Sequence, residues 1–194
     1  MGDASEGAGG RDGVTLTVLP TAALTPALRE VIIAMCDRAF APLEGVHDFA
    51  TLFDFVTDSM HVLAYDGDAL VGHACWEVRR IQPDGLPPLR TAYVDAVATE
   101  PARQGCGVGS AVMRRFAREA EDCQLHALAT DSAPGFYERL GWERWRGPLA
   151  ARTPHGLEPT PRPDDVVLIR RTPTTPALDL TARLIAHDRC EHPW

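Results

Sequence analysis

The stretch Tyr93-Val-Asp-Ala-Val-Ala-Thr-Glu-Pro-Ala-Arg-Gln-Gly-Cys-Gly-Val-Gly-Ser-Ala-Val-Met-Arg-Arg-Phe-Ala-Arg-Glu119 decides how this chain folds. Residues 93–99 alternate bulky and small side chains over the length of a strand, and residues 103–109 form a loop with three glycines. From Val108 onward, apolar residues recur at helical spacing between arginines, which predicts an amphipathic helix. A strand, a glycine loop and a helix start together leave bare backbone N–H groups that can face an anion.

The loop excludes two common phosphate-binding motifs. Gly105, Gly107 and Gly109 do not fit the six-residue dinucleotide fingerprint, and no Lys-Ser or Lys-Thr pair follows them as in a P-loop. A tight turn before an ordinary amphipathic helix stays open as the alternative to an anion site.

The loop resembles the Gln/Arg-x-x-Gly-x-Gly/Ala signature of the GCN5-related N-acetyltransferases, which Gln104, Gly107 and Gly109 match. In that family the loop amides bind the pyrophosphate of acetyl-coenzyme A. The resemblance therefore implies acetyl-coenzyme A as the co-substrate. The implied contacts are Gln104, Gly105, Cys106, Gly107, Val108, Gly109 and Ser110.

Alternation and turn residues outside this stretch predict further strands and helices. The predicted strands cover residues 14–19, 60–65, 69–80, 90–99, 125–130, 142–146 and 166–171. Helices are predicted from Thr25-Pro26 to before Pro42, from Asp48 to Val56, over 133–140 and over 178–185, and residues 147–164 are expected to be irregular.

This element order resembles that of the acetyltransferase family. The resemblance implies an α/β (α+β) fold with a mixed central sheet flanked by helices. The central strand and the strand after the glycine-loop helix would run parallel and splay apart.

Length and composition limit the remaining possibilities. A chain of 194 residues is expected to form one domain over 14–194, after a disordered tail over 1–13. The tail is no secretory signal and no apolar run approaches 18 residues, so we expect a cytoplasmic protein that no membrane holds. The formal net charge of -8 argues against nucleic acid and favours a cationic partner.

Residue inventory excludes some chemistries. All 19 basic residues are arginines, so no lysine can form a Schiff base. The seven histidines show no metal-ligand spacing, and no metal is expected. Five cysteines without a paired pattern suggest reduced thiols, and Cys106 reads as a small loop filler because no histidine lies near it in sequence.

Acetyl transfer to an amine needs a bound thioester, a proton acceptor for the ammonium and a proton donor for the thiolate. In the family, amides of the central strand hold the pantetheine arm and thioester oxygen, and the matching positions are Val97 and Thr99. Tyr137 matches the family tyrosine near the coenzyme sulfur and is the predicted acid; a core tyrosine is the alternative. Asp95, unusual inside an apolar strand, is the predicted base or substrate anchor, with a structural cap as its alternative.

Several segments resemble the aminoglycoside 2'-N-acetyltransferases more specifically. They are Tyr93-Val-Asp-Ala-Val-Ala, Leu128-Ala-Thr-Asp-Ser, Tyr137-Glu-Arg-Leu-Gly-Trp, Thr160-Pro-Arg-Pro-Asp-Asp-Val-Val and the terminal Trp194. The resemblance implies a cationic aminoglycoside as acceptor, held by acidic side chains, and a homodimer. The implied substrate contacts are Asp48, Asp95, Asp131, Ser132, Asp164, Asp165, His192 and Trp194 with its α-carboxylate.

One departure affects the expected acceptor. His192 stands where the relatives carry an acidic residue, which removes one negative charge from a site for polycations. We therefore expect a less cationic acceptor or one with its own carboxylate, such as kasugamycin, and antibiotic resistance as the consequence of its acetylation. Another amine acceptor (a polyamine, an amino acid or a protein N-terminus) and a non-catalytic acyl-coenzyme A-binding module stay open.

Overall fold

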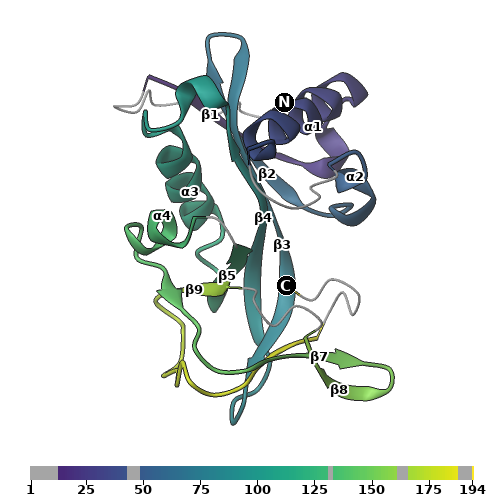
Figure 1. Cartoon of the computed structure of the whole chain (residues 1–194), viewed down its shortest axis with the longest axis vertical. Helices are drawn as coiled ribbons and strands as arrows, with labels where there is room; N and C mark the ends of the chain where they lie inside the picture. Colours follow the sequence, from purple (N-terminus) through teal and green to yellow (C-terminus); the bar gives the residue numbers. More distant parts are fainter. Residues whose placement is uncertain (1–12, 43–48, 131–132, 161–165, 188–193) are drawn as a thin grey trace, which may run out of the picture. The chain divides into compact units, whose positions relative to one another are not determined.

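The computed structural model describes residues 13–42, 49–130, 133–160, 166–187 and 194 (Figure 1). Contacts divide the chain into two compact units, residues 1–77 with 96–118 and residues 78–95 with 119–194. Of the predicted tail, only Gly13 is described. No helix in the described part of the chain is long and apolar enough to cross a membrane.

The first unit is built on an antiparallel group of three strands, β1 (Thr15–Pro20), β2 (Met60–Asp66) and the first half of β3 (Ala69–Pro83). The β2–β3 hairpin turns at Gly67, whose φ of +58° suits glycine, as the Asp-Gly-Asp sequence predicts. Across this hairpin His61 pairs with Cys75 and Leu63 with His73. Paired residues point to the same face, so this register decides which side chains meet.

One face of these strands is covered by α1 (Pro26–Phe40). The helix begins as predicted, because the Thr25 side chain accepts a hydrogen bond from the N–H of Leu28 and Pro26 needs no partner at the first position. Its buried residues Ile32 and Met35 pack into a core cluster with Leu63 of β2. The short helix α2 (Leu52–Phe55) starts later than predicted, and Asp48 lies outside the described residues.

The opposite face is covered by α3 (Val108–Glu119). Gly72 of β3 lets this helix approach, since a Cβ there would lie 2.7 Å from Cγ1 of Val108. Two residues on, Trp76 meets Phe116 of α3 edge-to-face with ring centroids 5.5 Å apart. Between residues 72 and 76 of β3, even-numbered residues therefore face α3 and odd-numbered residues face α1.

The second unit contains the parallel pair that the resemblance implied. The strand β4 (Leu89–Thr99) pairs in parallel with β5 (Leu125–Thr130) from Thr91↔Leu125 to Tyr93↔Ala127. Both strands continue past the last of these pairs, which agrees with the expected splay. On its other edge β5 pairs antiparallel with β9 (Val166–Arg171), which pairs with β6 (Glu143–Arg144).

Two predictions for the C-terminal third are wrong. Residues 147–164 were expected to be irregular, but β7 (Leu149–Thr153) and β8 (Gly156–Pro159) form a hairpin there. A helix was expected over 178–185, but β10 (Leu184–Ala186) pairs with β7 and β3, and the carbonyl of Leu180 accepts bonds from the N–H groups of residues 146 and 147. Pairing with distant strands outweighs the local apolar spacing.

The strands follow the hydrogen-bonded order β6-β9-β5-β4-β3-β10-β7-β8, with β2 and then β1 also joined to β3. Helix α4 (Pro134–Glu138) is shorter than predicted, and 3-10 turns cover Thr21–Ala23 and Pro101–Arg103. The expected mixed α/β sheet flanked by helices is therefore confirmed. The core of the second unit gathers side chains of β3, β4, β5, β9 and β10, including Tyr93, together with Trp145, which follows β6.

Candidate functional site

The glycine loop of the first unit is shaped for backbone contacts. Gly105 and Gly107 have φ values of +73° and +88°, a conformation that disfavours other residues. The first helical bond of α3 joins the N–H of Ala111 to the carbonyl of Gly107. The N–H groups of Val108, Gly109 and Ser110 thus come before any intrahelical bond, at the positive end of the helix dipole. This end of the helix can bind an anion.

Side chains around the loop tie it to neighbouring elements of the same unit. The Gln104 amide donates to the carbonyl of Thr99 at 3.3 Å, which joins the loop to the end of β4. Arg103 forms an ion pair with Asp66 at the end of β2. Glu100 pairs with Arg38 of α1 at 2.8 Å. These contacts fix where the loop leaves β4.

Cys106 is exposed at the tip of the loop. Its sulfur lies 3.6 Å from the carbonyl oxygen of Gln104. Its backbone N–H donates to the carbonyl of Arg103 at 3.4 Å, which closes the turn that leads into the loop.

The backbone of β4 is irregular where the thioester contact is predicted. Ala96 has a φ of +50°, the one positive φ among non-glycine residues in the described ranges. An alanine in this region costs about 1 kcal/mol or more, so surrounding contacts must hold it. Its carbonyl oxygen lies 2.9 Å from Nδ1 of His73. The neighbours Asp95 and Val97 are both half-buried.

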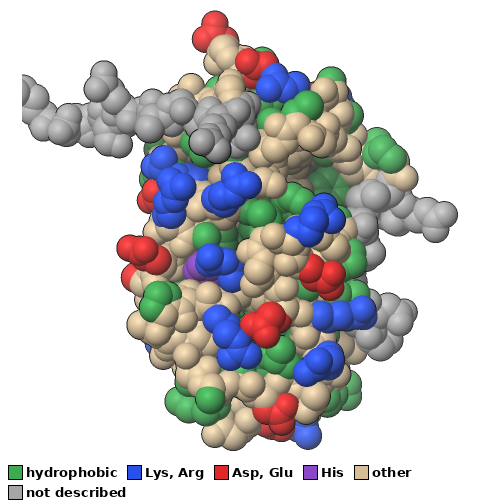
Figure 2. Space-filling model, turned by 90° about the vertical axis from the view of Figure 1, so that its left-hand side faces the viewer, with side chains coloured by type: hydrophobic (Ala, Val, Ile, Leu, Met, Phe, Trp, Pro, Cys, Tyr) green, Lys and Arg blue, Asp and Glu red, His purple; other side chains and the backbone are tan. Residues whose placement is uncertain are grey.

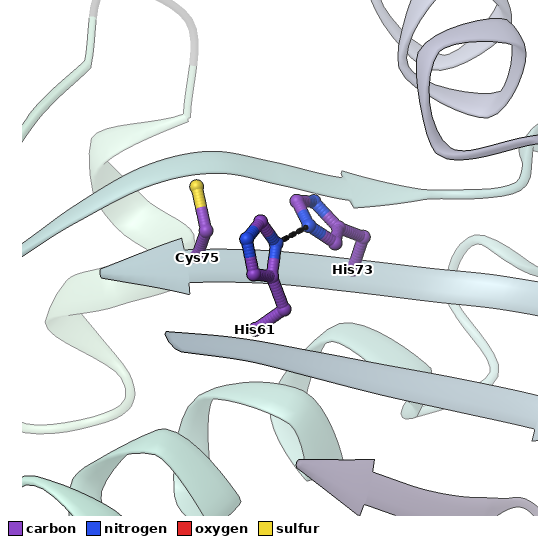
Figure 3. Close-up of side chains that lie close together, drawn as sticks. All are labelled: His61, His73 and Cys75. Atoms are coloured by element: carbon purple, nitrogen blue, oxygen red, sulfur yellow. Dashed lines mark hydrogen bonds between the residues drawn. The ribbon is translucent and has the colours of Figure 1, made fainter. Parts of the chain in front are cut away.

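Behind Ala96 runs a chain of buried polar groups in the first unit. His73 Nε2 lies 2.9 Å from His61 Nδ1 (Figure 3). His61 Nε2 in turn lies 2.9 Å from the Thr21 hydroxyl. Burial is the main cause that lowers the pKa of His61 to about 3 and that of His73 to about 4. Both rings are therefore neutral at physiological pH.

The two histidines and Cys75 form a group of candidate metal ligands. One ligand atom from each lies within 4.8 Å of the others, and all three are buried (Figure 3). Sequence spacing missed this cluster because the β2–β3 register, and no local motif, brings the residues together. The facing nitrogens of His61 and His73 are already hydrogen-bonded to each other, so this arrangement is explained without a metal.

The predicted acid lies in the second unit. Tyr137 of α4 is buried and its ring meets those of Phe136 and Trp142 edge-to-face at 4.9 Å and 5.9 Å. Burial raises the pKa of its hydroxyl well above the usual value, so the group keeps its proton at physiological pH. A protonated phenol can donate to a thiolate.

The predicted substrate residues are only partly covered by the structure. Asp95 is half-buried on β4, and Trp194 packs against the core cluster of the second unit. The remaining predicted contacts lie outside the described residues: Asp48, Asp131, Ser132, Asp164, Asp165 and His192.

One buried cation was not predicted. Arg79 is 2% exposed, with its guanidinium carbon 4.3 Å from the centroid of the Tyr93 ring. On the surface, Figure 2 shows arginine and acidic side chains interspersed over one face, so the net negative charge is not gathered there.

Comparison with known proteins identifies similar chains. The acetyltransferase (GNAT) domain family matches residues 57–144. The aminoglycoside 2'-N-acetyltransferase of Mycolicibacterium fortuitum is 32% identical over 185 residues, which cover 93% of this chain and 92% of that protein.

Solved structures share the fold at low sequence identity. An acyl-CoA N-acyltransferase from Pseudomonas aeruginosa has a TM-score of 0.59 and 17% identity, covering 81% of this chain and 99% of its own. The ribosomal-protein-S18-alanine N-acetyltransferase of Escherichia coli has a TM-score of 0.55 and 15% identity, and the match covers 85% of this chain and 97% of that protein.

Proposed function

From the premise that this chain belongs to the GNAT acetyltransferases and is an N-acetyltransferase, we propose that it acetylates an amino group of an aminoglycoside antibiotic. The observation that carries this proposal is the 32% identity, over nearly the whole chain, to an aminoglycoside 2'-N-acetyltransferase. Kasugamycin is the more specific candidate, and a homodimer is the proposed assembly.

Acetyl-coenzyme A is the acetyl donor in this proposal, since GNAT acetyltransferases use it. The positive-φ glycines and the open N–H groups at the start of α3 support binding of its diphosphate by residues 104–110. Amides of Val97 and Thr99 on β4 would hold the pantetheine arm and the thioester oxygen. When bound, the coenzyme supplies an activated acyl carbon.

Two side chains would move the protons. Asp95 takes a proton from the acceptor ammonium, directly or through water, or anchors the acceptor. The free amine then attacks the thioester carbon, loses its second proton to solvent as the amide forms, and expels the coenzyme thiolate. Tyr137 donates its proton to that thiolate, which its raised pKa supports, because the hydroxyl stays protonated until a strong base approaches.

The acceptor is proposed from charge. A chain with net charge -8 attracts polyamines and aminoglycosides, and Asp164 and Asp165 would hold further amines of the drug. His192 in place of an acidic residue favours an acceptor that carries its own carboxylate, as kasugamycin does. Acetylation removes a positive charge that binds ribosomal RNA phosphates, so resistance would follow.

Release of free coenzyme A thiol tests the proposal with kasugamycin, gentamicin, spermidine and a short peptide as acceptors. We expect turnover with at least one aminoglycoside and little with the other two. Turnover confined to spermidine or the peptide would replace the acceptor class. Thermal stabilisation by acetyl-coenzyme A without turnover on any amine would indicate a binding module.

A further inference from the structure

We propose that His73 is a positioning residue that sets the peptide group between Ala96 and Val97 for acetyl transfer. The inference rests on the proposed function, in which the Val97 N–H contacts the acetyl donor. His73 itself lies buried on β3 and would touch neither substrate. Its effect would pass through one hydrogen bond, from Nδ1 to the carbonyl oxygen of Ala96 at 2.9 Å.

One bond can orient the donor because a peptide group is rigid. The carbonyl of Ala96 and the N–H of Val97 belong to the same planar unit and point in opposite directions. A carbonyl held by His73 therefore aims the Val97 N–H away from His73. Rotation of this unit would turn both groups together.

The peptide needs such a restraint because its local conformation is unfavourable. Ala96 has a φ of +50°, a conformation that costs free energy in alanine because of its Cβ and does not in glycine. Without the bond, Ala96 would relax toward an ordinary strand conformation and move the Val97 N–H. The restraint and the strained residue thus occur at the same position.

The direction of the hydrogen bond between His73 and Ala96 is fixed by its acceptor. The Ala96 carbonyl only accepts, so Nδ1 of His73 must carry the hydrogen. The neutral ring then accepts at Nε2 from Nδ1–H of His61. The Thr21 hydroxyl lies 2.9 Å from His61 Nε2 and also donates toward the carbonyl oxygens of Val56 and Ser59, at 2.8 Å and 3.0 Å. Thr21 is held in turn by its backbone N–H, which donates to the carbonyl of Ser59 at 2.8 Å. The Ala96 carbonyl thus sets the tautomer of His73, with the hydrogen on Nδ1.

Three substitutions of His73 separate the hydrogen bond from packing. In His73→Asn the amide nitrogen replaces Nδ1 and can still reach the Ala96 carbonyl. In His73→Gln the nitrogen replaces Nε2 and faces His61 instead. His73→Leu fills the volume without a donor. Leu63→Ala, at the paired position on β2, is the control for lost packing with the bond intact.

We expect kcat to fall about 10- to 100-fold in His73→Leu and His73→Gln, the loss typical of a misplaced contact, with the KM for the amine little changed. His73→Asn should stay within about fivefold of wild type although it leaves unfilled space. Leu63→Ala should lower the melting temperature while keeping kcat. Activity that follows melting temperature across the four variants, or wild-type kcat in His73→Gln, would overturn the proposal.

A second measurement needs no turnover. The amide resonance of Val97 in the nitrogen-15-labelled free protein should shift in His73→Gln and stay near its wild-type position in His73→Asn and Leu63→Ala. An unmoved Val97 resonance in His73→Gln would also overturn the inference. If the wild type acetylates none of the amines, the proposed function fails separately, and the resonance together with acetyl-coenzyme A affinity still decides the role of His73.

Discussion

Individual residues differ in how far the sequence reveals their role. Tyr137 and Asp95 stand out in sequence because each lies in a motif or breaks an apolar pattern. His61 and His73 do not, because they are twelve residues apart and meet only through the β2–β3 register. The hairpin turn at 66–68 predicts that β2 and β3 pair, which brings the two histidines together. It does not predict the φ of +50° at Ala96, whose carbonyl oxygen His73 contacts.

Replacing Tyr137 with phenylalanine removes the proposed proton donor and keeps the ring packing. We expect kcat to fall about 10- to 1,000-fold, with acceptor KM changed little, because general acid catalysis contributes on this scale. Steady-state kinetics by thiol release measures both constants. Tyr65→Phe makes the same chemical change elsewhere and should leave them unaltered; full activity in Tyr137→Phe would remove the assigned role.

Asp95→Asn tests the carboxylate on β4. If Asp95 both anchors and deprotonates the amine, kcat should fall and the acceptor KM should rise, each by about tenfold or more. Asp68→Asn, in the exposed β2–β3 turn, is the matched control and should behave as wild type. A variant with unchanged kcat and KM would leave Asp95 with a structural role only.

At the scale of elements, the sequence pattern correctly predicted helices and strands whose ends are set by nearby residues. Helix α1 starts at its Thr25 cap, and the strand over 125–130 has the predicted bounds. The strand β10 was missed because its partners β3 and β7 are far away in sequence, so its strand character depends on tertiary pairing. The β7–β8 hairpin is local, but β8 is exposed throughout and carries no alternating apolar pattern. The splay of β4 and β5 was expected only from the family resemblance, because hydrophobic periodicity does not reveal the order of strands in a sheet.

Gly107→Ala tests the loop as an element. An alanine at φ +88° is strained and would move the N–H groups that begin α3, so we expect the Kd for coenzyme A to rise about tenfold or more. Isothermal titration calorimetry measures this directly. Gly85→Ala carries similar strain at φ +83° in the β3–β4 turn, with no atom within 4 Å, and should bind coenzyme A normally. Equal losses in both variants would mean that strain alone lowers the affinity.

For the whole molecule, we propose that the two compact units act as the single domain expected over 14–194. The strands β3 and β4 each contribute residues to both units, so unfolding of one should disrupt the other. A single urea transition, seen alike by circular dichroism and tryptophan fluorescence, is expected.

The buried histidine pair makes that stability depend on pH. The folded pKa values of about 3 and about 4 lie below the unfolded value near 6.5, so the unfolded chain binds more protons below pH 6.5. The free energy of unfolding should therefore fall as pH decreases from 7 to 5, by on the order of 2 kcal/mol per histidine. Urea unfolding across this range measures it, and a flat profile would contradict a neutral pair.

The most direct test of the account is a titration of the nitrogen-15-labelled protein with coenzyme A and, separately, with pantetheine, which lacks the diphosphate. Coenzyme A should shift the amide resonances of residues 104–110 strongly, and pantetheine should leave them near their free positions. Unshifted loop amides at saturating coenzyme A would contradict diphosphate binding by this loop.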